Sequence, residues 1–513
     1  MTSRRTGIGS GGPQTVASLE GSAAGVLLGS GITIASALGV RVAMVRFLTP
    51  DDLGAVLLAI AVTSVGGMVA TSGLRSASAR RIADRLALGA RPEAQSAART
   101  AIGLSLATGL VAALLIPFLP LLGLGRLADL PLAVLAGTAP AALGLSVGVA
   151  MWGISQGHGD TRGRALFRDA GGSALRLAGV VAAGLLSGGP ACFALGWGMG
   201  SLIGELAFVG YGARRGWLSR SAPASARVDR GLIRSLPPFI GMTVINQAAT
   251  WLDIVLLGAL APLAAVGIYG AAQGLSRVLG QVSDSASHRF LPLASAAVAA
   301  GDEVTLASGY RRSRQLAFAY LWPALAPCLL CPQALVRVAF GAHYEVAGSA
   351  LRWLAAGWLA RSLAGYTEEA LVARGRAAQV FAITLGSTLL IAALFFTWVP
   401  VWGALGAAMA VAAGQALRGA VGVALFDPPL RRAALMPVDF LRFFGAAAPA
   451  LAVALGFAAW PGASPAWLVL GGVVLAALAA ASRLAARALR SFFAGARRER
   501  AGRPEDRPGS SAE

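Results

Sequence analysis

Residues 46–54 read Arg-Phe-Leu-Thr-Pro-Asp-Asp-Leu-Gly and link two long apolar stretches, residues 22–45 and residues 53–73. A helix needs roughly 20 apolar residues to cross the hydrocarbon core of a bilayer, and both stretches are long enough. Backbone groups find no water inside a bilayer, so helices are the only plausible spanning form for runs of this length. The segment therefore predicts two membrane-spanning helices joined by a short turn.

The pattern of this first hairpin continues along the chain, and each further apolar run is bounded by an arginine cluster or by a Gly/Pro turn. The fourteen predicted spans cover residues 22–45, 53–73, 100–123, 131–154, 170–187, 190–212, 236–260, 266–296, 316–338, 350–373, 377–399, 403–426, 440–459 and 465–486. The sequence thus predicts an all-α, polytopic membrane protein with about 14 transmembrane helices.

The composition excludes most other classes of protein. Of the 513 residues, 56% are hydrophobic and only 13% are charged, whereas a soluble globular protein carries about a quarter charged residues. The same apolar excess excludes a disordered chain. The three cysteines, Cys192, Cys328 and Cys331, are too few and too clustered for a disulfide framework.

The formal net charge of +20 comes from arginine, because all 43 basic residues are arginines and the chain has no lysine. We expect no nucleic-acid partner, since the sequence shows neither a basic face interleaved with stacking aromatics nor a known fold signature. Every second connection between spans is rich in arginine, and the alternate connections are nearly bare apart from Arg46 and Arg126. We call the two sides the Arg-rich end and the Arg-poor end. Cytoplasmic loops carry the basic excess, so both termini are predicted to be cytoplasmic.

The chain also contains an internal repeat. The first hairpin turns through Leu48-Thr49-Pro50 followed by Gly54, and residues 260–267 read Leu-Ala-Pro-Leu-Ala-Ala-Val-Gly. A second pair of turns, residues 157–164 and residues 373–376, lies between the fourth and fifth predicted helices of each half. We infer two six-helix lobes in the same orientation. The predicted organisation is a cytoplasmic tail (1–20), an N-terminal lobe (21–225), a C-terminal lobe (230–430), an extra two-helix hairpin (436–488) and a basic disordered tail (489–513).

Residues 46–54 resemble the "R-x-L-x-P-x-D/E-[FLY]-G" turn of the polysaccharide transporters, the O-antigen flippase-like branch of the multidrug/oligosaccharidyl-lipid/polysaccharide (MOP) exporter superfamily. Each further motif is weak alone. Together they occur in the same order along the chain as in the family, which makes the resemblance fairly specific. The further similar segments are residues 253–258, 266–269, 290–292, 340–344 and 403–408. The absence of lysine, in which this family is otherwise rich, and the variable C-terminal helix pair leave the substrate open.

The resemblance implies two pseudo-symmetric lobes that rock about a central cavity in the bacterial cytoplasmic (inner) membrane. The implied cargo is an undecaprenyl-pyrophosphate-linked oligosaccharide, flipped outward for capsule, exopolysaccharide or O-antigen (lipopolysaccharide) synthesis. The implied partners are this lipid-linked oligosaccharide, the lipid bilayer, a polysaccharide polymerase and glycosyltransferases. We expect neither enzymatic activity nor a cofactor, and the sequence has no Gly-rich loop ending in Lys-Ser/Thr that would bind ATP.

Charged groups within a span are costly and usually face a wet cavity, so they are the candidates for cargo binding. Arg277 is the first choice, because it is predicted at mid-span, where a guanidinium could bind phosphate oxygens bidentately. An equal alternative is a structural ion pair of Arg277 with Asp253 or Asp284. The candidate substrate-binding residues are Arg277, Arg41, Arg361, Arg176, Asn246 and Gln273. The candidates for ion coupling are Asp253, Asp284 and Glu368.

Other roles stay open for several of these residues. The amides of Asn246 and Gln273 could instead form interhelical hydrogen bonds, and Glu368 could anchor its helix near the cytoplasm. Arg46 is favoured as an anchor that reaches the lipid headgroups. The stripe of Gly196, Gly200 and Gly204 is explained by close helix packing.

Other functions also stay open. A cation-coupled multidrug exporter of the same superfamily predicts an acidic, aromatic-lined cavity, which the arginine excess disfavours. A peptidoglycan lipid-linked precursor flippase shares the fold and differs only in motif detail. A membrane glycan polymerase predicts a long periplasmic loop or paired catalytic residues, and the predicted loops are short. The cysteines and histidines show no metal-ligand spacing, so no metal is expected.

Overall fold

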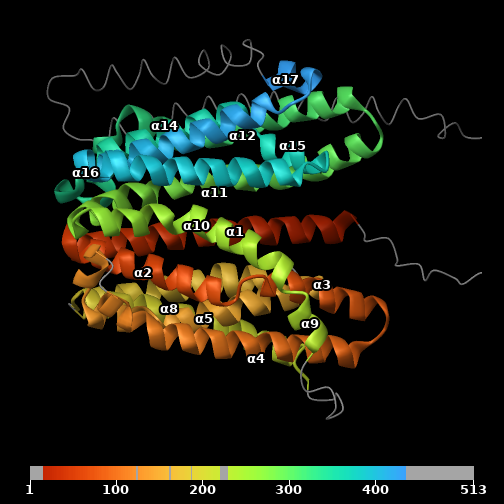
Figure 1. Ribbon diagram of the computed structural model, residues 1–513, viewed down its shortest axis with the longest axis horizontal. Coiled ribbons are helices and arrows are strands. Elements are labelled where there is room, and N and C mark those ends of the chain that lie inside the picture. The colour runs from red at the N-terminus through yellow and green to blue at the C-terminus, as the bar shows by residue number, and fades with distance from the viewer. Residues whose placement is uncertain (1–15, 123–124, 161–162, 187, 220–228, 435–513) are drawn as a thin grey trace, which may run out of the picture.

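The computed structural model describes residues 16–122, 125–160, 163–186, 188–219 and 229–434, and it contains helices without strands over these ranges (Figure 1). The helical elements are α1 (Val16–Phe47), α2 (Pro50–Ala70), α3 (Leu74–Ala87), α4 (Arg91–Leu115), η1 (Ile116–Leu122), η2 (Gly125–Asp129), α5 (Leu132–Gly157), η3 (Arg164–Gly171), α7 (Gly172–Leu185), α8 (Pro190–Arg214), α9 (Arg230–Arg234), α10 (Pro237–Leu260), α11 (Leu263–Ala299), α12 (Glu303–Leu330), α13 (Pro332–Phe340), η4 (Ala342–Tyr344), α14 (Ala347–Ala364), α15 (Thr367–Ala373), α16 (Ala377–Ala424) and α17 (Pro428–Ala434). The prediction of an all-α fold is confirmed.

Four of the predicted spans differ from the prediction in where they break or end. The ninth breaks at Cys331, because Pro332 restricts the residue before it and starts the separate helix α13. The tenth breaks at Gly365, whose φ of 72° lies in the region that favours glycine. The eleventh and twelfth run on as α16, with a kink at Gly403, where φ is 53°. The last two predicted spans lie outside the described residues.

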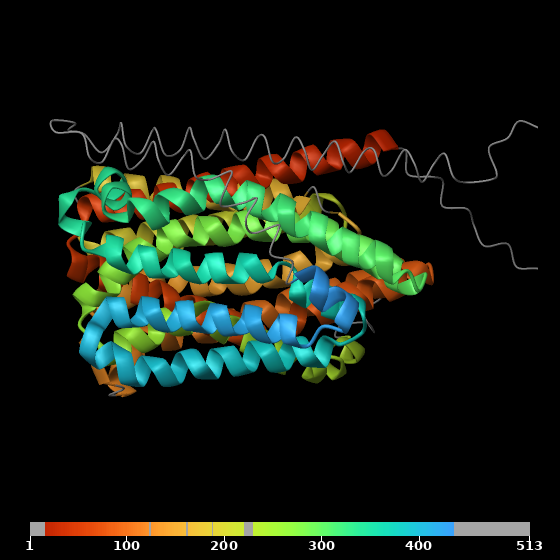
Figure 2. The same ribbon diagram turned by 90° about the horizontal axis from the view of Figure 1, so that it is seen from above.

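The long helices run side by side along the longest axis of the molecule (Figure 2). The N-terminal helices pack around α5, which contacts α2, α3, α4 and α8, and α7 covers α8. The second half is organised around α11 and α14, which contact each other as well as α12 and α16. In Figure 1 the two groups lie one above the other, with α1 and α10 between them.

The glycine stripe on α8 explains how tightly α7 packs. A Cβ on Gly196 would overlap the carbonyl oxygen of Gly179, and a Cβ on Gly200 would lie 2.7 Å from the Cα of Arg176. Gly204 meets the backbone of Gly172 in the same way. The prediction that this stripe serves close packing is therefore confirmed.

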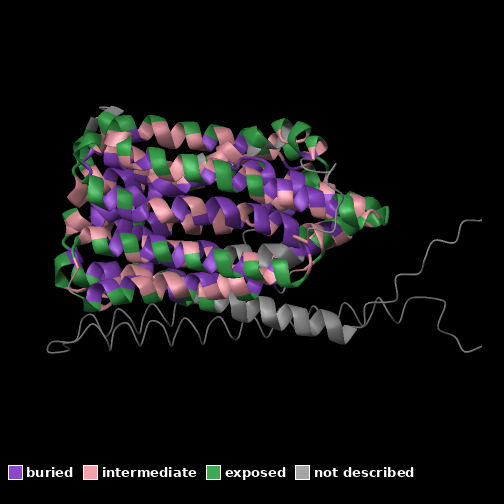
Figure 3. Cartoon of the chain, turned by 90° about the horizontal axis from the view of Figure 1, so that it is seen from below, coloured by how far each residue is buried: buried purple, intermediate pink, exposed green. Residues whose placement is uncertain are grey.

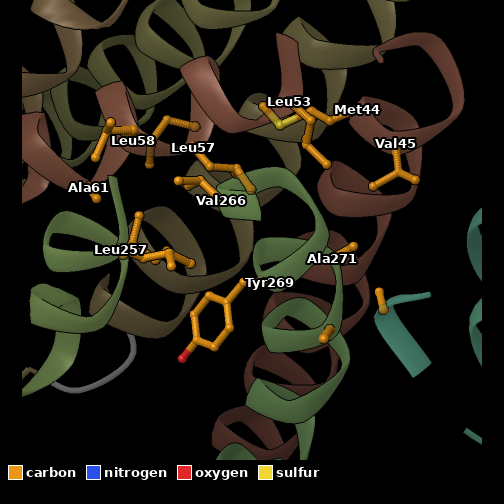
Figure 4. Close-up of a cluster of buried hydrophobic side chains, with 14 of the residues drawn as sticks. Met44, Val45, Leu53, Leu57, Leu58, Ala61, Leu257, Val266, Tyr269 and Ala271 are labelled. Carbon is orange, nitrogen blue, oxygen red and sulfur yellow. The ribbon is translucent and has the colours of Figure 1, made fainter. Parts of the chain in front are cut away.

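The two halves meet through a buried apolar core at the Arg-poor end. Figure 4 shows Leu57 from the first half lying against Val266 from the second, with Leu58 and Leu257 in the same cluster, and all four side chains are buried. The hydroxyl group of Tyr344 adds a hydrogen bond of 2.9 Å to the carbonyl oxygen of Leu48. Apolar packing and this polar contact together hold the halves in contact at this end.

The repeated turns mark the two ends of the molecule. At the Arg-poor end, Thr49 caps α2 by accepting a hydrogen bond of 3.2 Å from the backbone N–H of Asp52, and the paired turn starts α11 directly after Pro262. At the Arg-rich end, Gly159 and Gly375 occupy matching turns with φ of 70° and 73°. The turns that the sequence pairs thus share backbone features.

The outer surface is apolar, as a bilayer requires. Buried residues are concentrated in the interior of the molecule, and exposed residues cover its outside (Figure 3). On α4 the exposed side chains include Leu106, Leu110, Val111 and Leu114, a stripe with helical spacing. Among the described residues, five helical segments are long and apolar enough to cross a membrane: Pro50–Ala87, Arg91–Leu121, Leu132–Gly157, Pro190–Arg214 and Ala377–Ala424. The chain is a polytopic membrane protein.

Candidate substrate cavity

A cavity of about 330 Å³ lies between the two halves. Along α1 it extends from Met44 to Thr33, and along α2 from Leu57 to Met68, which is the direction of the Arg-rich end. Four basic residues from different elements reach its wall, against two acidic ones. The basic residues are Arg41, Arg168, Arg176 and Arg277, and the acidic residues are Asp169 and Glu205. The lining therefore carries a net positive charge.

Arg41 crosses from α1 to the second half over a surface made of glycine. A Cβ on Gly274 would lie 2.7 Å from Cγ and 3.0 Å from Nε of Arg41, and a Cβ on Gly270 would lie 3.5 Å from its Nη1. These glycines are one helical turn apart on α11, so the missing side chains leave room for the guanidinium. The Nη1 atom of Arg41 is buried without a hydrogen-bond partner in the described part of the chain.

Arg277 meets Arg41 from the opposite helix. Both side chains line the cavity between the halves, Arg41 from α1 and Arg277 from α11. The guanidinium carbon of Arg277 lies 4.4 Å from the centre of the Trp251 ring, a cation–π contact. Its Nη2 atom is also buried without a hydrogen-bond partner among the described residues.

The third predicted arginine, Arg176, lies on α7 and reaches the same cavity. Its Nη2 atom donates a hydrogen bond of 2.9 Å to the hydroxyl oxygen of Ser173. Gly200 on α8 lets the backbone of α7 approach closely at this point. The structure therefore brings together Arg41, Arg176 and Arg277, three of the six predicted substrate-binding residues.

Sequence reasoning missed the ion pair of Arg168 and Glu205. Their closest atoms are 3.4 Å apart, and their side chains are only 13% and 6% exposed. Glu205 fits against Gly148, where a Cβ would overlap its carboxylate. The signal was available, because Glu205 is the only charged residue in the apolar run 190–212.

A second cavity of about 160 Å³ lies within the second half and shares Arg277 with the first. The carboxylate of Asp253 lines it and accepts hydrogen bonds of 2.7 Å from the hydroxyl group of Tyr269 and 2.5 Å from Nε2 of Gln273. No ion pair within 4.0 Å joins Asp253 to Arg277 in the described structure. The predicted alternative role of Gln273, interhelical hydrogen bonding, is what this geometry shows.

Arg361 and Glu368 lie elsewhere, in an ion cluster of the second half. Nη1 of Arg361 donates a hydrogen bond of 3.1 Å to Gln415, and its Nη2 lies 3.6 Å from the carboxylate of Glu368. Glu368 also accepts two hydrogen bonds from Arg418, one of them 2.7 Å long. Arg361 and Glu368 line a small pocket of their own, which neither Arg41 nor Arg277 lines.

Two predicted residues cannot be placed by their side chains. Asn246 belongs to α10 and Asp284 belongs to α11, and both side chains lie outside the described part of the structure. Arg46, by contrast, is exposed at the end of α1, in agreement with its predicted role as a headgroup anchor.

A sequence profile described as "polysaccharide biosynthesis protein" matches residues 22–292, more than half of the chain. The chain belongs to this polysaccharide biosynthesis family. The match covers most of α1, all of α7 and most of α11, the helices that carry Arg41, Arg176 and Arg277. No curated protein sequence matches this member of the family.

Solved structures show that the family member has the fold of MOP superfamily transporters. It is similar to the lipid II flippase MurJ in an inward closed conformation, with a TM-score of 0.71 at 13% identity over 91% of this chain and 99% of that one. It is also similar to a multidrug resistance MATE family transporter in an inward-facing conformation, with a TM-score of 0.63 at 17% identity over 76% of this chain and 92% of that one. For a MATE family transporter in an outward-facing conformation the TM-score is 0.53 at 17% identity, over 78% of this chain and 92% of that one.

The arrangement of this polysaccharide biosynthesis protein suits an anion more than a cation. Arg41 and Arg277 are electrostatic neighbours, and each has a buried donor group without a partner in the described structure. Unpaired donors and neighbouring like charges are costly away from water. A ligand with several negatively charged oxygens would satisfy these donors and offset the repulsion.

Proposed function

We propose that this chain flips an undecaprenyl-pyrophosphate-linked oligosaccharide across the cytoplasmic membrane for polysaccharide synthesis. The family and the fold are those of transporters, and the proposal adds the cargo and the direction. The observation that carries it is the convergence of Arg41, Arg176 and Arg277 from three helices on one cavity between the halves.

The chemistry of the cavity fits the two polar parts of such a cargo. A guanidinium group presents a planar set of donors that matches phosphate oxygens, and two neighbouring arginines match the two phosphates of a diphosphate. Trp197 and Trp251 also line the cavity, and their rings offer surfaces on which sugar rings could pack. The lipid tail would remain in the bilayer, outside the protein.

Transport would proceed by alternating contact of the two halves. The Arg-poor end is closed by the apolar core that contains Met44, Leu57 and Val266, and the cavity extends toward the Arg-rich end. If the Arg-rich end is cytoplasmic, this state receives cargo from the cytoplasm. Separation of the core and closure of the opposite end would then release the cargo outside.

A peptidoglycan precursor carries the same lipid diphosphate, so it is the second candidate cargo. The MurJ structure, whose fold this chain shares, is described as a lipid II flippase. A multidrug exporter is less well supported, because four arginines face two acidic residues in the cavity between the halves. Cationic drugs would be repelled by this surplus of positive charge.

The proposal is tested by deleting the gene and restoring it as wild type, Arg41→Gln, Arg277→Gln or Arg126→Gln. Arg126 is exposed on η2 and provides a control that loses the same charge. The readouts are undecaprenyl-linked oligosaccharide in the cells and polysaccharide outside them. We expect the deletion and both cavity variants to accumulate the lipid-linked intermediate and to lose secreted polysaccharide, and the control to restore both.

The strains are compared only where each variant is present in the membrane at the same amount as the wild-type protein. Unchanged polysaccharide and intermediates in the deletion strain would contradict the proposed cargo. Accumulation of lipid II with loss of cell-wall integrity would assign the chain to peptidoglycan instead. Altered drug sensitivity alone would make it an exporter.

A further inference from the structure

A second group of arginines surrounds Trp152 near the Arg-rich end. The guanidinium carbons of Arg75, Arg164 and Arg168 lie 4.1, 4.3 and 5.1 Å from the centre of the Trp152 ring. We call these four residues the mouth cluster. Trp152 lies five residues before the end of α5, about 8 Å along the helix axis.

Two local features bring these residues together. Gly153 lets α3 pack closely on α5, because a Cβ there would lie 3.0 Å from the Cα of Arg75. Arg164 and Arg168 both belong to η3, a π-helix that continues directly into α7. Such π-helical turns are rare and are often found at functional sites.

The mouth cluster has more positive charge than its neighbours neutralise. Arg164 lies 3.2 Å from the carboxylate of Asp169, and Arg168 lies 3.4 Å from that of Glu205. Arg75 forms no ion pair within the described structure, and it shares the Trp152 ring with the guanidinium groups of Arg164 and Arg168. Three guanidinium groups around one ring therefore share two acidic partners.

The cluster also contains donor groups without acceptors. Nε1 of Trp152, Nε of Arg164 and Nη1 of Arg168 are all buried and make no hydrogen bond in the described part of the chain. Arg164 and Asp169, and Arg168 and Glu205, are close enough to attract each other, but Nε of Arg164 and Nη1 of Arg168 make no hydrogen bond to these carboxylates. Each unsatisfied buried donor carries a desolvation cost that an anionic oxygen could remove.

Arg168 connects this cluster to the cavity between the halves. It contacts the Trp152 ring and also lines the 330 Å³ cavity, and Arg176 lies about two helical turns further along η3 and α7. Arg41 and Arg277 follow deeper in the same cavity. Arg168 thus belongs both to the mouth cluster and to the lining of the cavity that holds the central arginines.

We propose that the mouth cluster is a second anion site, which binds the phosphate groups of the lipid diphosphate before they reach Arg41 and Arg277. The inference rests on the proposed function for the identity of the cargo. Binding first at the mouth would concentrate a scarce lipid at the cavity and orient its diphosphate toward the central arginines.

The test uses the purified full chain in nanodiscs and radiolabelled inorganic pyrophosphate as the probe. In the Arg41→Gln/Arg176→Gln/Arg277→Gln background the three arginines of the central site are removed, and we expect pyrophosphate binding to persist at the mouth. Adding Arg75→Gln or Arg164→Gln should weaken that binding about tenfold, the loss typical of one hydrogen-bonded charge. Arg80→Gln is the matched control, because Arg80 is an exposed arginine on the same helix as Arg75.

Three results would overturn the proposal. The triple variant could bind no pyrophosphate, or Arg80→Gln could weaken binding as much as Arg75→Gln does. Phosphatidylglycerol in the nanodisc could also displace all bound pyrophosphate, which would make the cluster a site for lipid headgroups. Arg75→Gln and Arg164→Gln come from different elements, so one misfolded variant would not decide the outcome.

Failure of this inference can be told apart from failure of the proposed function. In the otherwise wild-type chain, Arg75→Gln should slow the initial rate of flipping and leave pyrophosphate binding at the central site unchanged. If the deletion strain shows no polysaccharide defect while pyrophosphate still binds at the mouth, the proposed cargo is wrong, but the mouth cluster is still an anion site.

Discussion

Gly54 and Gly267 lie against each other where the two halves of the molecule meet. A Cβ on Gly54 would overlap the carbonyl oxygen of Leu263 and lie 3.1 Å from the backbone nitrogen of Gly267. A Cβ on Gly267 would overlap the carbonyl oxygen of Pro50 and lie 3.2 Å from the nitrogen of Gly54. The contact is reciprocal, and it joins the first turns of α2 and α11, the helices that follow the two repeated Leu-x-Pro turns.

We expect Gly54→Ala to weaken the closed Arg-poor end. The obstructing atoms belong to the backbone and cannot rotate away, so the halves must shift, at a cost of about 1–3 kcal/mol. Transport should slow while the chain still folds, because each half keeps its own core. In a cysteine-free background, Val266→Cys, which is buried in this core, should react faster with a membrane-impermeant maleimide when Gly54→Ala is present.

Gly103→Ala is the matched control for this experiment. Gly103 lies within α4, and a Cβ there meets nothing within 4 Å. Alanine favours a helix over glycine by about 1 kcal/mol, so this variant should be neutral or slightly more stable. Equal maleimide reactivity in the Gly54 and Gly103 variants would show that the glycine contact does not control opening.

Gly274→Ala should impair transport through Arg41. A Cβ at residue 274 would meet Cγ and Nε of Arg41, which are not at the free end of that side chain. The guanidinium would therefore leave its place beside Arg277. We expect accumulation of the lipid-linked intermediate, as in Arg41→Gln, with thermal stability close to wild type. Full transport by Gly274→Ala would mean that this position of Arg41 is not required.

The positions of most long helices and of the paired turns can be predicted from the sequence. They depend on local runs of apolar residues and on turn residues such as Pro50, Pro262 and Gly375. It also contains the type of residue that a diphosphate site needs. These signals are local in the chain, and a single sequence displays them directly.

The grouping of the charged residues depends on how each helix is rotated, and that is not local. A helix that is apolar all round has no hydrophobic face to fix its rotation. The sequence therefore groups Arg361 with Arg277 as a candidate, although the structure places it with Glu368 and Arg418. The convergence of Arg75, Arg164 and Arg168 on Trp152 likewise depends on packing between α3, η3 and α5.

The ion pair of Arg168 and Glu205 should stabilise the first half. Removing one partner leaves a buried charge, so we expect Glu205→Gln to lower the free energy of unfolding by about 3 kcal/mol. Arg168→Gln/Glu205→Gln removes both charges and should recover part of this loss. A double-mutant cycle in detergent, followed by denaturant titration, measures the coupling between the two residues. Strictly additive effects would show that the pair is not coupled.

Asp229 links α3 to the start of the second half and gives a pH-dependent prediction. Its carboxylate accepts hydrogen bonds of 3.0 and 3.1 Å from Arg81 and also caps α9. Burial alone would raise the pKa of Asp229, but the hydrogen bonds and charge of Arg81 and the backbone N–H groups outweigh it and lower the pKa below its usual value.

Because the folded-state pKa of Asp229 is lowered, its contribution to stability is present above the unfolded pKa of about 3.9 and is lost as the pH falls through the folded value. Asparagine can still accept the backbone hydrogen bonds that cap α9, so Asp229→Asn removes only the charge paired with Arg81 and should be less stable than wild type at pH 6 by about 1 kcal/mol. The difference should shrink as the pH falls below 4. Thermal unfolding of both proteins between pH 3 and pH 7 measures this, with Asp84→Asn as a control on an exposed carboxylate of α3. A difference that stays constant over this range would mean that the charge of Asp229 does not stabilise the link.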